Sequence, residues 1–75
     1  MFKLTVINVG VYLEDLKREW ILSAKYGSLY KNSGAFIIED FLHKTKKDAL
    51  KLLIKNIEKY PNWYNSKTQF RIEET

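Results

Sequence analysis

Thr45–Pro61 reads T-K-K-D-A-L-K-L-L-I-K-N-I-E-K-Y-P, and this stretch decides the fold because it encodes a complete helix. Thr45 is a favourable N-cap residue, and Asp48, three residues later, complements the helix dipole in the first turn. Pro61 prevents the helix from continuing, because its ring fixes φ and it has no backbone N–H. The sequence therefore predicts a helix over residues 46–60.

The two sides of this helix differ in character. One side carries apolar residues at a spacing of three or four, which predicts a stripe that packs on a sheet. The stripe comprises Ala49, Leu50, Leu53, Ile54, Ile57 and Tyr60, with Leu52 on its flank. The opposite side carries a lysine at every fourth position and only two acids, so we expect it to be exposed and positively charged. These lysines are Lys47, Lys51, Lys55 and Lys59.

Alternating and β-branched segments elsewhere in the chain predict strands. The first begins at Phe2 and either becomes apolar on both faces or contains a bulge near Asn8–Gly10. Further strands are expected over 18–26, 35–43 and 67–74, with a loop over 27–34 and a turn over 62–66. Residues 14–17 suit a hairpin loop or one helical turn. We favour the hairpin, although the sequence leaves open whether residues 11–19 contain a helical turn.

The predicted order is β-β-β-α-β, which indicates an α+β fold in a single domain covering residues 1–75. We expect an antiparallel four-stranded sheet with one helix packed on one face. Alternation then directs several apolar residues away from the helix, and these could form an open patch for a partner or a second copy. Alternatively, strand twist and the loop over 27–34 cover that patch. The residues concerned are Ile7, Val9, Ile21 and Ile37.

Length and composition limit the class of protein. At 75 residues the chain can bury only a small core, so dimerisation is one expected route to stability. A hydrophobic fraction of 45% argues against intrinsic disorder. The absence of cysteine excludes disulfides, thiolate metal ligands and thiol catalysis, and it fits a reducing compartment. No apolar run has the length of a membrane span and no signal-peptide core is present, so we predict a cytoplasmic protein without membrane contact.

The inventory of reactive side chains predicts no enzyme. His43 is the only histidine, and no nucleophile motif surrounds any serine, so we expect it to be a surface or helix-capping residue. Glu39 and Asp40 are adjacent in a predicted strand, which would direct them to opposite faces. Neither a phosphate-binding glycine motif nor a metal-ligand spacing occurs. We therefore predict no catalytic residues, no metal and no cofactor.

The lysine row of the predicted helix permits a nucleic-acid interpretation. Lysines neutralise phosphates irrespective of base sequence, and Lys44 and His43 extend the basic region to the start of the helix. Exposed helices in lysine-rich proteins have the same appearance for reasons of solubility. Under the nucleic-acid hypothesis the contact residues are Lys44, Lys47, Lys51, Lys55 and Lys59.

Aromatic residues in predicted turns are the more selective indication of function. Tyr26, Tyr30, Trp63 and Tyr64 lie in or beside turns, where exposed rings anchor protein interfaces or stack on unpaired bases. In the alternative interpretation Trp63 and Tyr64 fold back and cap the open end of the core. Either way, these four residues are the predicted partner-binding set.

Three predicted strands followed by a helix beginning Thr45-Lys46-Lys47-Asp48-Ala49 resemble the arm-DNA-binding domain of phage-type integrases, over about residues 18–60. That resemblance implies a sheet that enters the major groove, but the predicted strand over 67–74 departs from it. In size and composition the chain also looks like short phage proteins that block host machinery. We predict a non-enzymatic protein that docks on a macromolecular partner and modulates or inhibits it, for example a host nucleic-acid-processing protein. Direct nucleic-acid binding is the alternative, and a homodimer is possible in either case.

Overall fold

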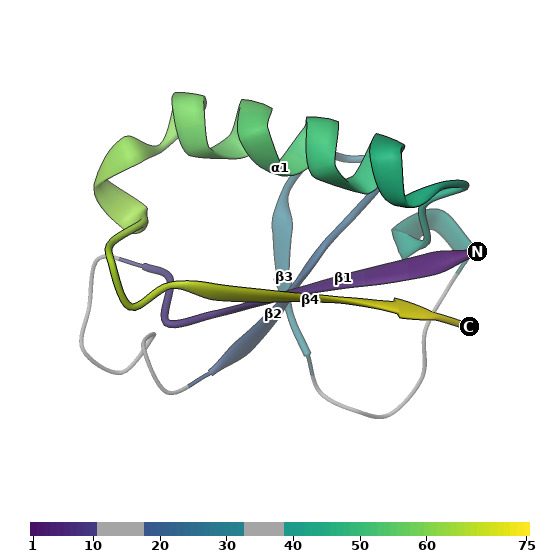
Figure 1. Cartoon of the computed structure of the whole chain (residues 1–75), viewed down its shortest axis with the longest axis horizontal. Helices are drawn as coiled ribbons and strands as arrows, with labels where there is room; N and C mark the ends of the chain where they lie inside the picture. Colours follow the sequence, from purple (N-terminus) through teal and green to yellow (C-terminus); the bar gives the residue numbers. More distant parts are fainter. Residues whose placement is uncertain (11–17, 33–38) are drawn as a thin grey trace.

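The sheet and helix expected from the sequence are both present in the computed structural model, which describes residues 1–10, 18–32 and 39–75. Within these residues, strands β1 (Phe2–Ile7), β2 (Glu19–Leu22), β3 (Leu29–Lys31) and β4 (Gln69–Glu74) form an antiparallel sheet of order β3-β2-β1-β4. Helix α1 (Lys46–Lys59) lies along one face of that sheet (Figure 1). Two short 3-10 helices, η2 (Glu39–Phe41) and η3 (Pro61–Trp63), flank α1. The predicted α+β class and the order β-β-β-α-β are confirmed.

Helix α1 begins and ends with the residues that the sequence indicates. The Oγ1 of Thr45 accepts a hydrogen bond from the backbone N–H of Asp48 at 3.0 Å. At the other end the N–H of Tyr60 donates to the carbonyl of Asn56 at 2.9 Å, and Pro61 then opens η3. The helix therefore stops one residue earlier than predicted, because Tyr60 leaves the helical conformation ahead of the proline.

The side of α1 that faces the sheet differs from the predicted stripe. Ala49, Leu53 and Asn56 are buried, whereas three predicted stripe residues are exposed. A polar contact accompanies this orientation: the Asn56 amide donates to the carbonyl of Gly27 at 3.2 Å and connects the helix to the segment between β2 and β3. The exposed stripe residues are Leu50, Ile54 and Ile57.

The third strand lies earlier in the chain than predicted. β3 falls inside the segment predicted to be a loop, while Glu39–Phe41 of the predicted strand forms η2. A tight turn makes this possible: Gly27 has φ +65°, and the Ser23 N–H donates to the Ser28 carbonyl at 2.9 Å. At the end of the predicted strand His43 forms an isolated antiparallel bridge with Phe2. Residues 35–38 of that prediction lie outside the described residues, as does the predicted hairpin loop at 14–17.

The end of β1 turns the chain into the core. Asn8 adopts a left-handed conformation with φ 61°, and Val9, predicted to point away from the helix, is buried in the core that α1 covers. β1 ends at Ile7 and the chain turns at Asn8, so residues 8–10 form neither a continued strand with two apolar faces nor a bulge within a strand. Ile21 is also buried and Ile7 is half-buried, so these positions do not form the predicted open patch. Ile37 lies outside the described residues.

The core occupies the space between the sheet and α1. Its buried residues come from β1, β2, the segment after β1 and the helix, and partly buried rings and aliphatic chains surround them. The buried members are Leu4, Val6, Val9, Leu22, Ala49 and Leu53. Burial decreases toward β4, where Phe70 is 54% exposed. The core is therefore best covered on the β2 side and least covered on the β4 side.

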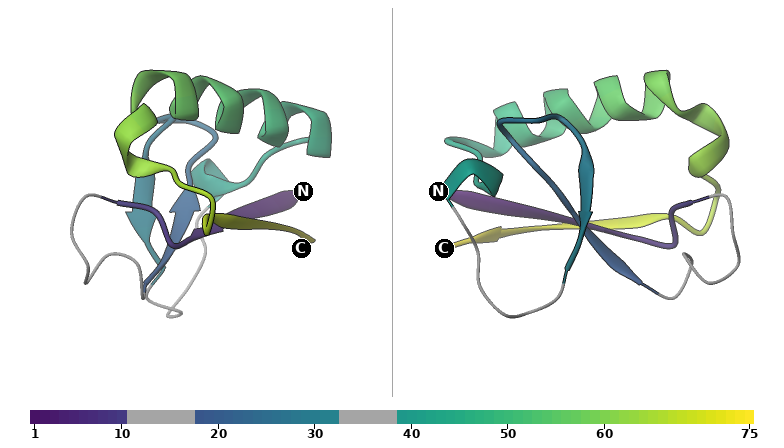
Figure 2. Two further views of the ribbon diagram at one scale, coloured as in Figure 1. Left: turned by 60° about the vertical axis from the view of Figure 1, so that its left-hand side comes forward. Right: turned by 180° about the vertical axis from the view of Figure 1, so that it is seen from behind.

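The two termini lie side by side at one end of the sheet. All three views place the N-terminus next to the C-terminus, with β1 and β4 running along one another (Figures 1 and 2). The Thr75 N–H donates to the Met1 carbonyl at 2.9 Å, which extends this pairing beyond both strands. Figure 2 also shows α1 on a single side of the strongly twisted sheet.

Candidate functional site

The four predicted aromatic anchors separate into two pairs in the structure. Tyr26 and Tyr30 lie together, with their ring centroids 6.0 Å apart in an edge-on arrangement. Tyr30 also stacks on Phe41 of η2 at 5.0 Å, so three rings form one cluster, here named the aromatic surface. Tyr26 is 53% exposed and Tyr30 is 38% exposed. These rings therefore support one another while a large part of their area remains in contact with solvent.

Trp63 and Tyr64 form the other pair, and the structure packs them against the core. Trp63 stacks on Tyr60 with a centroid distance of 4.1 Å, and the Tyr64 hydroxyl donates to the side-chain carbonyl oxygen of Asn56. Both residues are only partly exposed. This is the arrangement expected if they cap the open end of the core. Of the four predicted anchors, Tyr26 and Tyr30 are therefore the ones that the structure leaves exposed.

Burial of Tyr64 creates a pH dependence that can be measured. Desolvation of its phenol raises the pKa from 10.0 to about 12. The folded state holds the phenol proton more tightly than the unfolded state does. The resulting contribution to the free energy of unfolding is therefore fully present below pH 10 and is lost between pH 10 and pH 12. We expect the free energy of unfolding to fall across that interval, and the Tyr64→Phe variant to show a smaller fall. Urea titrations of both proteins at several pH values make the comparison. Equal pH dependence in both would contradict the assignment.

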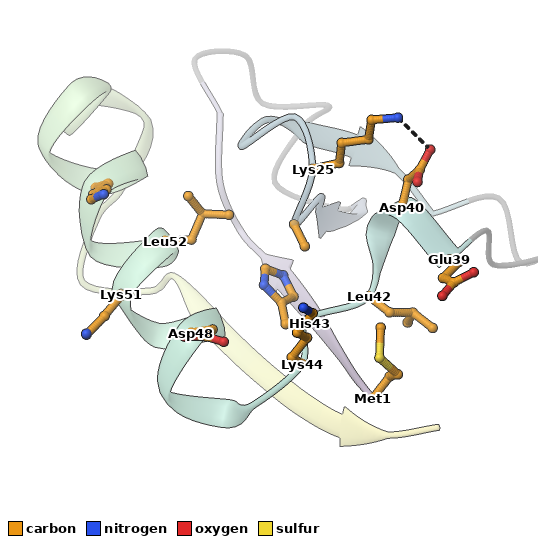
Figure 3. A pocket seen from close by; sticks show the side chains of 12 residues that line it. Met1, Lys25, Glu39, Asp40, Leu42, His43, Lys44, Asp48, Lys51 and Leu52 are labelled. Atoms are coloured by element: carbon orange, nitrogen blue, oxygen red, sulfur yellow. Dashed lines mark ion pairs between the residues drawn. The ribbon is translucent and has the colours of Figure 1, made fainter.

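A hollow lies between one flank of α1 and the η2 segment, and its lining includes Lys25 and Asp40, the sequence neighbours of Tyr26 and Phe41 (Figure 3). It has a volume of about 590 Å³ and is open to solvent. Four lysines and three carboxylates surround it, so its lining has mixed charge. One pair is in contact: the Lys25 ammonium lies 3.5 Å from an Asp40 carboxylate oxygen, as the dashed line in Figure 3 marks. The charged lining residues are Lys25, Lys44, Lys51, Lys55, Glu39, Asp40 and Asp48.

His43 lies against this hollow but is almost fully buried, with 2% of its surface exposed. Its Nε2 is 2.8 Å from the carbonyl of Leu22, and since a carbonyl can only accept, Nε2 carries the proton. Its backbone exchanges two hydrogen bonds of 2.8 Å with Phe2. Of the two predicted positions for His43, the surface is wrong because the residue is buried; it does lie just before the Thr45 cap, where its side chain links β2 to the segment that precedes α1.

Asn56 is another buried polar residue, and the sequence does not single it out. Its amide bonds the Gly27 carbonyl and its carbonyl oxygen accepts from Tyr64, so one side chain connects α1 to two turns. The available signal was its position: Asn56 stands seven residues after Ala49, which places it on the same face of a helix. The predicted stripe does not contain Asn56 because that stripe was defined by apolar side chains alone.

The prediction that Glu39 and Asp40 lie in a strand is wrong, because both belong to η2. Both line the hollow, so the argument that they point to opposite faces of a sheet does not apply. Asp40 is engaged with Lys25, while Glu39 is exposed. Among the described residues no group of three or more possible metal ligands converges.

The lysine row of α1 lies at the surface as expected. All five residues of the nucleic-acid hypothesis are exposed, and within the described residues none has a carboxylate oxygen within 4.0 Å of its ammonium group. Three of them border the hollow, while Lys47 and Lys59 do not. The ammonium of Lys59 instead lies 5.3 Å from the ring centroid of Tyr60. The set is Lys44, Lys47, Lys51, Lys55 and Lys59.

Comparison of the chain with known protein families, with curated proteins and with solved structures finds no match. In the described part of the chain, none of the helices combines the length and the apolar character that crossing a bilayer requires. The aromatic surface, the hollow and the lysine row are therefore the features of the molecule that bear on its function.

Proposed function

We propose that this chain is a non-catalytic cytoplasmic protein that docks on a protein partner through the aromatic surface and the adjoining hollow, and that it modulates or inhibits that partner. The observation that carries the proposal is the exposure of Tyr26 and Tyr30 in a cluster that their own stacking holds in place. Rigid, exposed tyrosines provide large contact areas with little loss of side-chain entropy on binding. The phage-type inhibitor of a host nucleic-acid-processing protein is one member of this class.

The charges around the hollow favour a protein partner over a nucleic acid. A nucleic-acid backbone needs a surface of one sign, and here three carboxylates stand among four lysines. The Lys25 ammonium is already engaged with Asp40. A protein surface can match this mixture, because it can place acidic groups against Lys51 and Lys55, basic groups against the carboxylates and an apolar group against Tyr26.

A photo-cross-linking amino acid in place of Tyr26 tests the proposed docking surface. We expect it to capture one protein in nuclease-treated extract, whereas the same group in place of exposed Lys67, remote from the aromatic surface, captures none. With the captured protein purified, Tyr30→Ala is expected to raise the dissociation constant at least tenfold, about 1.4 kcal/mol, because it removes the ring that contacts both neighbours. The matched control Lys67→Ala leaves the constant unchanged. Equal affinity of Tyr30→Ala and the parent chain would overturn the proposal.

The lysine row provides the observation that favours the second candidate, direct nucleic-acid binding. A titration with DNA and RNA at two salt concentrations separates the two functions. Under the proposed function we expect binding no tighter than the ~10⁻⁴–10⁻⁶ M of non-specific contacts at physiological salt. Tight binding that collapses as salt rises, and that the double substitution Lys47→Glu/Lys51→Glu abolishes, would establish the alternative.

A further inference from the structure

The outer edge of β4 is an unpaired sheet edge in the described part of the chain, where the strand order ends β1-β4. The Thr75 N–H donates to Met1, and hydrogen-bonded pairs recur at every second residue of an antiparallel ladder. The backbone groups of Phe70, Ile72 and Glu74 therefore point away from β1. Three successive outward positions form a template long enough to pair with another strand.

The flank of α1 on the same side is apolar and exposed. Leu52 and Asn56 face Gly27, between β2 and β3, so the opposite flank of the helix lies on the β4 side of the core. Successive residues turn by about 100° around a helix, which places the three exposed aliphatic residues of α1 on that flank. Ile54 is 55% exposed, and Phe70 of β4 is 54% exposed. The flank comprises Leu50, Ile54 and Ile57.

The charges of β4 select what can pair with it. Arg71 and Glu73 lie on the face of the sheet opposite α1, with the Arg71 Nε 2.9 Å from a Glu73 carboxylate oxygen. If two β4 strands pair antiparallel with Ile72 opposite Ile72, then Arg71 of each copy lies directly opposite Glu73 of the other. The smallest shift that keeps the same faces aligned is about two residues, because side chains alternate between faces. Such a shift in one direction places Arg71 opposite Arg71, and in the other direction it places Glu73 opposite Glu73. Opposite charges favour the first register and like charges disfavour its neighbours.

This register also brings the apolar surfaces together. The two-fold axis is perpendicular to the sheet and passes midway between the Ile72 residues of the two copies. It therefore keeps α1 of both copies on the same face of the joined sheet. Phe70 and Ile72 of both strands then lie between the two exposed helix flanks. The pairing adds about six backbone hydrogen bonds, because three residue pairs each exchange two. We propose that this chain forms a two-fold symmetric homodimer in which two β4 strands join their sheets into one.

Two single charge reversals test the register directly. Arg71→Glu alone and Glu73→Arg alone each place like charges opposite one another across the two strands. Each variant is therefore expected to sediment at the 8.9 kDa of one chain. The parent chain is expected to reach twice that mass as its concentration rises from about 1 µM to about 1 mM. An equimolar mixture of the two variants restores opposite charges across the strands and is expected to sediment as the dimer. A parent chain that stays monomeric throughout, or a dimer that survives in both single variants, would overturn the proposal.

Cysteine cross-linking provides a second measurement that does not depend on charge. The chain contains no cysteine, so Ile72→Cys introduces one thiol per copy at the two-fold axis. We expect mild oxidation to give a disulfide-linked dimer, since Cα atoms of directly opposed residues are about 5.5 Å apart. Phe70→Cys is the matched control, because Phe70 opposes Glu74 and not itself. Preferential cross-linking at Phe70 would contradict this register, and Tyr30→Ala should leave both results unchanged because docking uses another surface.

Discussion

Replacing Asn56 with leucine is expected to lower the free energy of unfolding by about 3 kcal/mol, although the two side chains share a branched shape and the same number of non-hydrogen atoms. Asn56 is 3% exposed, and its amide serves both the Gly27 carbonyl and the Tyr64 hydroxyl. Leucine leaves these two groups without partners, and each buried unsatisfied group costs about 1–3 kcal/mol. A domain of this length has a total stability of roughly 4–11 kcal/mol, so the variant loses a large part of it. Urea denaturation followed by tryptophan fluorescence measures the change.

Two further substitutions separate the hydrogen bonds of Asn56 from general effects on α1. Lys55→Ala changes an exposed neighbour on the same helix and should alter stability by no more than about 0.5 kcal/mol. In a double-mutant cycle, Asn56→Leu and Tyr64→Phe should couple by about 1 kcal/mol, because they share one bond. Additive effects would show that the hydroxyl contributes independently of Asn56. A leucine variant as stable as the parent chain would show that the helix is seated by its apolar residues alone.

The sequence predicts α1 well because its signals are local. The Thr45 cap, the acidic first turn and Pro61 act within a few residues of themselves, and the structure contains each contact. The side of the helix that faces the sheet depends on contacts that are distant in the sequence, such as the hydrogen bond from Asn56 to the Gly27 carbonyl 29 residues away. No periodicity of apolar residues contains that information. The sequence therefore predicts the range of the helix well, but it predicts a buried side that differs from the one in the structure.

The third strand shows the same limit in another form. β3 is only three residues long, and its tyrosine favours a strand while its lysine does not, so β propensity alone does not distinguish it from a loop. It pairs because the turn at Gly27 returns the chain beside β2, with Tyr30 opposite Ile21. This pairing also brings Tyr30 close to Phe41. The sequence identified both tyrosines as candidate anchors, but only the tertiary arrangement shows that they share one surface.

The candidate site was only partly predictable for a related reason. Exposure of the lysine row follows from helical spacing and holds in the structure. The hollow depends on residues from the N-terminus, the β2–β3 segment, η2 and α1, which no sequence pattern brings together. His43 shows the difference most clearly: its burial follows from the position of Leu22, a residue on a different element.

Replacing His43 with leucine is expected to cost about 2–3 kcal/mol of stability, through the loss of the hydrogen bond to the Leu22 carbonyl. That carbonyl belongs to a fully buried residue, and His43 itself is 2% exposed, so leucine leaves a buried acceptor without its donor. The backbone bridge between His43 and Phe2 does not require the ring, so the sheet itself should persist in the variant. Circular dichroism checks the fold, and denaturant titration measures the loss.

Glutamine at position 43 is the matched control, because its side-chain amide can still donate to Leu22. We expect His43→Gln to recover about half of the stability that His43→Leu loses, and Lys44→Ala, an exposed neighbour, to change stability by no more than about 0.5 kcal/mol. If leucine and glutamine are equally destabilising, the volume of the imidazole and not its N–H holds this part of the fold. If both variants are as stable as the parent chain, the hydrogen bond that links β2 to the segment before α1 contributes nothing to the free energy of unfolding. The hollow beside His43 then owes its shape to the backbone and not to this side chain.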